Sequence, residues 1–303
     1  MNFWDTLAEM LVLLFAIAMG YAASRLGILG GEADKKISKL LLDITIPAMV
    51  LSSVCTGEAL PETAVILGSL GVSALFYGLE FLFTLIVPPL LGGEPGQKGV
   101  WRFTLVFGNT AFIGYPVVVS LFGPEALFRA VLLTLPFNLM AYTLGPLMLT
   151  GAKRFSLRQT LSPATVAAFV ALFMALTRVR PPAVVGEALA FVGEITGPLS
   201  LMFVGSLLAG LSLGRMLTSL RLWALTAVRL LVMPVALFLV LRGVKIDPLM
   251  FSVVVTEMGM PTAINGSLLC MEYGGDAECM AQITFVSTLA SIVTIPLLTV
   301  LLF

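Results

Sequence analysis

Two stretches of the sequence place Gly, Pro and Asn inside otherwise apolar runs, and their types and spacing suit ion binding. The first, Gly108–Pro116, reads Gly-Asn-Thr-Ala-Phe-Ile-Gly-Tyr-Pro. The second, Thr256–Gly266, reads Thr-Glu-Met-Gly-Met-Pro-Thr-Ala-Ile-Asn-Gly. A lone proline predicts only a kink, because it removes one backbone donor and clashes with the preceding turn. Clusters at corresponding places in two runs are instead typical of discontinuous helices around a transporter's central site.

The broken helices predict a site for a small carboxylate. Pro116 and Pro261 suit the first turn of a second half-helix, whose start presents free N–H groups and about half a positive charge. Two such ends can hold an anion without Arg or Lys. We expect Thr45 and Thr196 to close this site from neighbouring helices. The expected lining of the crossing is Asn109, Thr110, Gly114, Tyr115, Pro116, Pro261, Thr262 and Asn265.

The opposite sign of charge is expected where the first half-helices end. Free carbonyl groups there, together with Asn109, Thr110 and the Glu257 carboxylate, suit a cation. Ionisable side chains within a membrane span are costly and usually functional or paired. Glu257 has no counterpart in the other half of the chain, so we predict that it holds the coupling ion, which could be H⁺ or Na⁺.

Four further charged residues lie within apolar runs. Glu80 and Arg229 occupy near-equivalent places, 149 residues apart, and we expect a structural ion pair between them. Asp43 and Glu194 each lie four residues before a proline. For these two, capping or hydrogen bonding to a kink is at least as good an interpretation as substrate contact.

The composition excludes a soluble domain and most catalytic chemistry. Hydrophobic residues make up 59% of the 303 residues and charged residues only 11%, against roughly 25% in soluble proteins. Lys and Arg equal Asp and Glu at 17 each, which gives no basic excess for nucleic acid. The absence of His excludes His-dependent catalysis and His metal ligands. The three Cys are expected to be packing residues.

The elements that must position the site are ten apolar runs, each near the ~20 residues that a membrane span needs. We therefore predict an all-α integral membrane protein with ten transmembrane helices. The helices are expected near residues 6–26, 37–57, 62–91, 100–122, 125–150, 161–178, 184–213, 219–242, 247–272 and 277–303.

Short matches between the two halves indicate an internal duplication. Asp43–Pro47 corresponds to Glu194–Pro198, and Phe122–Ala126 corresponds to Tyr273–Ala277, both at an offset of 151 residues. One match could arise by chance in apolar sequence, but two at one offset favour duplication. Because each half holds five helices, an odd number, the second half must insert upside down relative to the first. Inverted repeats are common among secondary transporters.

The expected organisation is a first repeat over residues 1–150, a cytoplasmic linker over 151–160 and a second repeat over 161–303. If both termini lie outside, the inner loops hold 11 Lys and Arg and the outer loops hold 5. This asymmetry predicts a multi-pass protein of the plasma membrane, of the bacterial inner-membrane kind, with both termini outside.

The residues above resemble the auxin efflux carrier family, which includes the plant PIN transporters and bacterial carriers associated with malonate and malate. The resemblance covers nearly the whole chain. Its best pieces are Leu40–Ala48, Gly108–Pro116, Met260–Asn265 and Tyr273–Asp276. It implies two inverted five-helix repeats in which helices 4 and 9 cross at the midplane, as in bile-acid symporters and NhaA-like transporters. The family's crossing prolines correspond to Pro116 and Pro261.

The resemblance also implies how the molecule moves. Helices 1, 2, 6 and 7 would form a scaffold, helices 3–5 and 8–10 would form a transport domain, and a homodimer is compatible with this arrangement. PIN proteins lack a carboxylate at the position of Glu257. The segment Glu257–Met260 instead resembles the helix-9 cation motif of the bile-acid sodium symporters, whose glutamine is replaced here by Pro261.

The sequence therefore predicts a secondary active transporter, not an enzyme. We expect it to move a small organic anion, auxin-like or malonate-like, by elevator-type alternating access, with Na⁺ or H⁺ as coupling ion. No other cofactor, no other metal and no nucleic-acid partner is expected. Alternatives are a Na⁺-coupled importer of a larger amphipathic anion, a transport-dead ligand sensor and, less well supported, an intramembrane acid protease.

Overall fold

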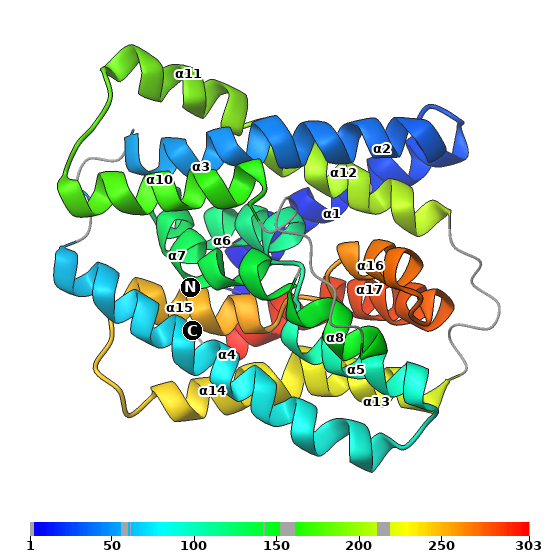
Figure 1. Ribbon diagram of the computed structural model, residues 1–303. Coiled ribbons are helices and arrows are strands. Elements are labelled where there is room, and N and C mark those ends of the chain that lie inside the picture. Colours follow the sequence, from blue (N-terminus) through cyan, green and yellow to red (C-terminus); the bar gives the residue numbers. More distant parts are fainter. Residues whose placement is uncertain are drawn as a thin grey trace.

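The computed structural model describes residues 3–55, 60, 62–141, 143–151, 161–210 and 219–302. Within these residues every regular element is helical (Figure 1). The helices of the first half are α1 Phe3–Arg25, α2 Gly31–Leu40, η1 Leu41–Thr45, α3 Ile46–Cys55, α4 Thr63–Leu91, α5 Pro95–Val106, η2 Thr110–Gly114, α6 Tyr115–Phe122, α7 Glu125–Ala141 and α8 Leu144–Thr150, where η denotes a π-helical turn.

The second half repeats this pattern of long and broken helices. Its members are α10 Pro163–Thr177, α11 Ala183–Gly193, α12 Thr196–Ala209, α13 Leu220–Ala227, η4 Val228–Val232, α14 Met233–Leu241, α15 Pro248–Met258, α16 Asn265–Tyr273 and α17 Ala277–Leu302. The predicted linker over 151–160 lies, apart from Gly151, outside the described residues.

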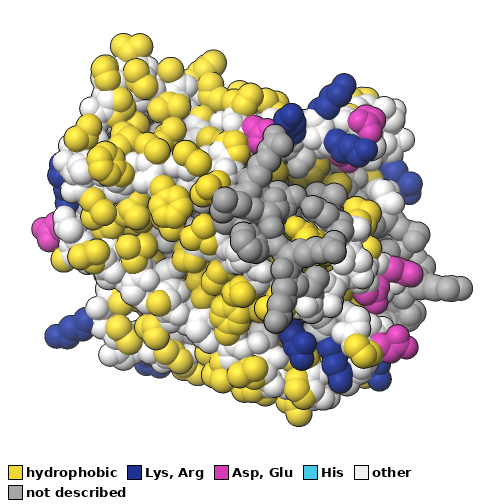
Figure 2. Space-filling view, in the orientation of Figure 1, with side chains coloured by type: hydrophobic (Ala, Val, Ile, Leu, Met, Phe, Trp, Pro, Cys, Tyr) yellow, Lys and Arg dark blue, Asp and Glu magenta, His cyan; other side chains and the backbone are white. Residues whose placement is uncertain are grey.

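The helices are long and apolar enough for a multi-pass membrane protein. Among the described residues, five helical spans could each cross a bilayer, and the bent pair of α7 and α8 makes a sixth. Four shorter apolar helices accompany them, and each of these ten units overlaps one of the ten expected runs. Figure 2 shows hydrophobic side chains across the middle of one face, with charged side chains toward its right and left edges. The ten-span topology and the inverted relation of the halves stay predictions.

One helix begins earlier than expected. The second helix starts at Gly31, not near residue 37, so the acidic and basic residues placed in a loop lie on its first turns. Asp34 explains the extension, because its carboxylate accepts the Gly30 N–H at 3.0 Å and the Ser206 hydroxyl of α12 at 2.8 and 2.9 Å. A buried carboxylate that accepts from these two donors ties the start of α2 to α12.

In the described part of the chain, three π-helical turns interrupt the long helices, and each ends two residues before a proline. The turns η1, η2 and η4 precede Pro47, Pro116 and Pro234. Proline cannot donate a hydrogen bond and clashes with the carbonyl four residues earlier, so a wider turn before it relieves the clash. Two of these turns contain a charged residue, Asp43 in η1 and Arg229 in η4.

The helices pack in groups that mix the two halves. In Figure 1, α2, α3, α10, α11 and α12 lie along the top, and α4, α5, α13 and α14 lie along the bottom. Helix α1 packs on α12, and α3 packs on α10 and α11. These are the helices that the resemblance assigns to a scaffold, and both the scaffold and its movement against the rest stay predictions.

Helices α1 and α12 approach closely at glycines. A Cβ on Gly20 would overlap the backbone of Met202, and a Cβ on Gly205 would overlap the backbone carbonyl of Ile17. Small residues permit such backbone approach between membrane helices, where packing contributes much of the association free energy.

We expect Gly205→Ala to lower the thermal unfolding midpoint of the purified protein. The added methyl group meets backbone rather than a movable side chain, so the helices must separate, at a cost of about 1–3 kcal/mol. Gly68→Ala is the matched control, because a Cβ on this α4 glycine meets nothing within 4 Å. Equal midpoints for the two variants would contradict the close packing of α1 on α12.

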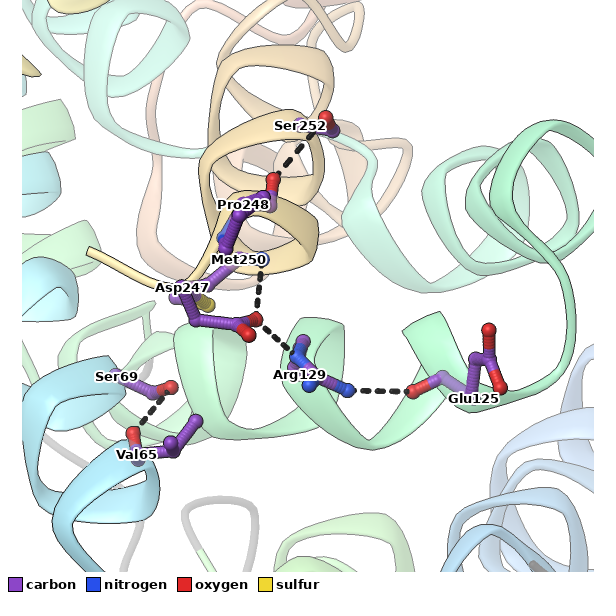
Figure 3. A network of polar contacts seen from close by, with 8 residues as sticks. All are labelled: Val65, Ser69, Glu125, Arg129, Asp247, Pro248, Met250 and Ser252. Atoms are coloured by element: carbon purple, nitrogen blue, oxygen red, sulfur yellow. Dashed lines mark hydrogen bonds and ion pairs between the residues drawn. The ribbon is translucent and has the colours of Figure 1, made fainter. Parts of the chain in front are cut away.

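The start of α15 is fixed to α7 by an ion pair (Figure 3). Asp247 caps α15 by accepting the Met250 N–H at 2.9 Å, and the same oxygen accepts the Arg129 Nε–H at 2.6 Å. Arg129 also donates to the Glu125 carbonyl at 3.3 Å. Both side chains of the ion pair are largely buried. This contact holds the helix that contains Glu257 against its neighbour.

Candidate functional site

Two broken helices cross at extended backbone in the middle of the molecule. Helix α5 ends before Phe107 and α15 ends before Gly259, and the following segments run antiparallel. Asn109 N–H donates to the Pro261 carbonyl at 2.6 Å, and Ala263 N–H donates to the Phe107 carbonyl at 2.9 Å. These two bonds satisfy backbone groups that the interruptions leave free, which bilayer interiors require.

Only one of the two prolines of the crossing lies in the first turn of a half-helix, as the sequence predicted for both. Pro116 does lie in the first turn of α6. Pro261 lies in the extended segment instead, and the second half-helix begins only at Asn265, so its predicted place in a first helical turn was wrong. The two backbones pair at Gly108 and Thr262. Position 108 has no room for a side chain, because a Cβ there would overlap the Arg229 guanidinium.

A cavity of about 640 Å³ lies beside the crossing. Its walls come from the broken helices, from η1 and α3, from α7 and from the start of α10. Its polar or charged lining residues are Asp43, Asn109, Thr110, Tyr115, Thr134, Ser162, Thr165 and Asn265. Its apolar lining includes Leu42, Ile46, Val50, Phe112, Val131, Leu135, Phe137, Ala168 and Ile264.

Asn109 lines this cavity and has an unused hydrogen-bond donor. The residue is 3% exposed, and its Oδ1 accepts the Phe112 N–H at 3.3 Å, so the carboxamide caps the half-helix formed by η2 and α6. This bond fixes which end of the amide faces away from Phe112. Its Nδ2 has no hydrogen-bond partner. A buried donor without a partner is costly, and a bound ligand oxygen would satisfy it.

Tyr115 is held in place by its hydroxyl. The Tyr115 oxygen lies 2.6 Å from Thr134 Oγ1, and Thr134 donates its own proton to the Ala130 carbonyl at 2.9 Å. Tyr115 is therefore the donor to Thr134, and its oxygen is left with acceptor capacity only. The side chain consequently shapes the cavity wall and cannot donate a proton to an anion while this bond exists.

Glu257 lies behind the crossing and does not line the cavity. Its side chain is fully buried, and both carboxylate oxygens lack a hydrogen-bond partner. A Cβ on Gly114 would overlap this carboxylate, so Glu257 lies directly against the backbone of Gly114 in η2. An unsatisfied carboxyl group at the end of a half-helix is suited to take up a proton or a cation.

Arg229 joins the crossing to a neighbouring helix. Its Nη1 lies 2.7 Å from Glu80 Oε1 of α4, which is the ion pair expected from the sequence, and both side chains are fully buried. The same Nη1 donates to the Leu105 carbonyl at 2.9 Å, and Nε donates to the Met260 carbonyl at 3.1 Å. One guanidinium therefore donates hydrogen bonds to carbonyl groups at or just beyond the ends of both first half-helices, where the helix dipoles favour a positive charge.

Six of the ten predicted binding residues do not line the cavity. They are Thr45, Gly114, Pro116, Thr196, Pro261 and Thr262. Thr262 instead receives structural support, since its N–H donates to Ser287 Oγ at 3.1 Å. Helix α12 reaches the crossing through Ser200, whose hydroxyl donates to the Phe112 carbonyl at 2.9 Å, and not through Thr196. The roles of all ten residues in binding stay predictions.

The crossing and its cavity fit the match to known proteins. A family model described as "Membrane transport protein" matches residues 5–154 and 146–299. The chain belongs to this family. It is the auxin efflux carrier family that the sequence resembles, and membership makes the protein a membrane transporter and not an enzyme.

Two relatives show how far the likeness extends. The chain is 26% identical over its full length to an "Uncharacterized transporter" of Methanothermobacter thermautotrophicus, which it also covers completely. It is 24% identical over 92% of its length to a "Putative malonate transporter" of Rhizobium meliloti, of which it covers 90%.

Sequence reasoning missed several cavity residues of this membrane transport family member. For Asp43 the sequence left capping of a kink and substrate contact both open, and the structure shows this residue exposed on the cavity wall. Ser162 and Thr165 also line the cavity. They lie at the start of α10, where Ser162 caps the helix by accepting the Thr165 N–H at 3.3 Å. The Ser-Pro start of this helix is visible in the sequence, but its position beside the crossing depends on tertiary packing.

Proposed function

We propose that this protein is a secondary active transporter of a small organic anion whose carboxylate binds beside the crossing. The observation that supports this best is Asn109, whose buried Nδ2 lacks a partner at the cavity wall. The half-helix that it caps adds a positive dipole end, so an anion is favoured without a cationic side chain. A relative named for malonate transport supports the same substrate class.

Transport would follow an elevator-type alternating-access cycle in two inverted repeats. Hydrogen bonds join both broken helices to each other and, through Arg229, to α4, which favours their movement as one unit. The Glu257 carboxylate lies against Gly114, which directly precedes the cavity residue Tyr115 in the chain, so we propose that H⁺ or Na⁺ bound there couples to the substrate. The family match divides near residue 150, which supports the proposed boundary of the repeats.

The proposed topology places both termini outside the plasma membrane. The excess of Lys and Arg in the loops assigned to the inside supports this orientation. The cavity reaches Leu161 and Ser162, next to the linker assigned to the inside, so this conformation would be open toward the cytoplasm. A homodimer is compatible with the many apolar side chains exposed on the scaffold helices.

A larger amphipathic anion is the second candidate. The cavity volume of about 640 Å³ is in the range that encloses drug-sized ligands, and much of its wall is apolar. Competition for uptake would separate the candidates. Inhibition by short carboxylates alone supports the small anion, whereas inhibition by bulky amphipaths alone supports the larger one. Ligand binding without any flux would instead indicate a sensor.

The first test of the binding site is Asn109→Ala. We expect this variant to bind carboxylates about 10- to 100-fold more weakly, because a hydrogen bond to a charged group contributes about 1.5–3 kcal/mol. Affinity is read from thermal shifts of the purified protein titrated with short carboxylates. Ser291→Ala is the matched control, since this buried hydroxyl bonds only within its own helix and does not line the cavity. Unchanged affinity in Asn109→Ala would remove it from the site.

A further inference from the structure

The cavity beside the crossing holds a negative charge that the binding of an anion does not explain. Among the described residues that line it, Asp43 is the only charged one. Its carboxylate makes no hydrogen bond or ion pair with any described residue, and the side chain is exposed on the π-helical turn η1. An acid alone on the wall of a cavity concentrates cations there.

The charges at the two walls are opposite in sign. The crossing presents the Asn109 Nδ2 donor and the start of the half-helix of η2 and α6, which both favour an anion. The wall formed by η1 presents Asp43, which disfavours an anion and favours a cation. A dicarboxylate whose first carboxylate binds at Asn109 would bring its second toward a like charge.

We propose that the substrate is a small carboxylate that also contains an ammonium group, with the carboxylate at Asn109 and the ammonium at Asp43. This inference rests on the carboxylate site of the proposed function and adds a cationic group to its substrate, which makes the substrate a zwitterion and not a net anion. The two groups bind at different elements, one on the broken helix and one on η1. When η1 and the broken helix close around the substrate, its ammonium group would therefore meet Asp43 and its carboxylate would meet Asn109.

The test uses acids that differ only at the end remote from the carboxylate. Propanoate, malonate and 3-aminopropanoate have three carbons and end in a methyl, a carboxylate and an ammonium group. The corresponding four- and five-carbon series vary the distance between the ends. Thermal-shift titrations of the full-length protein give an affinity for each acid. They are repeated on Asp43→Asn, and on Glu194→Gln as matched control, because Glu194 is the counterpart of Asp43 in the repeat, is exposed and does not line the cavity.

We expect the amino acid of at least one length to bind at least about tenfold more tightly than its methyl-ended and dicarboxylate counterparts. Asp43→Asn should abolish that preference, whereas Glu194→Gln should retain it. Equal or tighter binding of the dicarboxylate in the wild type, or a preference that survives Asp43→Asn, would overturn the inference and leave the proposed function standing. Absence of binding by every acid in all three series would overturn both.

Discussion

Arg229→Leu is expected to leave the protein largely unfolded in detergent. The change removes one partner of a fully buried ion pair and leaves Glu80 uncompensated, which costs about 3–5 kcal/mol. It also removes the donor to the Leu105 and Met260 carbonyls beside the crossing. The loss should be visible as a fall in the thermal unfolding midpoint and in the monodisperse fraction after purification.

The double variant Glu80→Leu/Arg229→Leu separates stability from function. Because an apolar pair can replace a buried ion pair at little cost, this variant should recover most of the lost stability. Carboxylate binding should stay weak, since the two carbonyls of the crossing still lack their donor and the crossing is no longer held to α4. Full recovery of both stability and binding would show that Arg229 only pairs with Glu80 and does not position the site.

Glu257→Gln is expected to abolish the dependence of transport on a cation gradient. Glutamine keeps the shape of the side chain but can neither release a proton nor bind Na⁺ as a carboxylate does. Uptake into proteoliposomes is measured with an imposed Na⁺ gradient and, separately, with an imposed pH gradient. The wild type should respond to one of the two, which identifies the coupling ion, and the variant should respond to neither.

Glu278→Gln is the control for that experiment. Glu278 is exposed at the start of α17, lies outside the cavity and accepts a hydrogen bond from Gln282 of its own helix. Its variant should retain the wild-type response to both gradients. If Glu257→Gln retains that response as well, Glu257 is not the coupling residue, and the coupling ion must bind elsewhere.

Much of the architecture follows from the order of residues along the chain. Apolar runs locate the helices, because a bilayer demands a minimum length of apolar sequence. Clustered Gly, Asn and Pro locate the two breaks, because these residues weaken a helix within the chain itself. The separation of 149 residues between Glu80 and Arg229 is close to the offset of 151 residues in the predicted repeat, and it led to the prediction of an ion pair that the structure confirms.

The contacts between helices could not be predicted in the same way. The bonds from Arg229 to two carbonyls depend on where three separate helices lie, and carbonyl groups are not distinguished by sequence. The same holds for Ser200 and for the cavity position of Asp43. The π-helical turns are an intermediate case, because the prolines are visible in the sequence but a simple kink explains them equally well.

The buried pair of Glu80 and Arg229 also has a consequence for biogenesis. Glu80 enters the bilayer with α4, and Arg229 is synthesised 149 residues later. Until α13 and α14 insert, the nascent chain must retain an unpaired acidic residue inside the membrane, which is unfavourable. Helices α1 to α8 therefore lack one partner of a buried ion pair until the second half is made. Synthesis of η4 supplies the counter-charge of Glu80, which links the stability of the first half to completion of the chain.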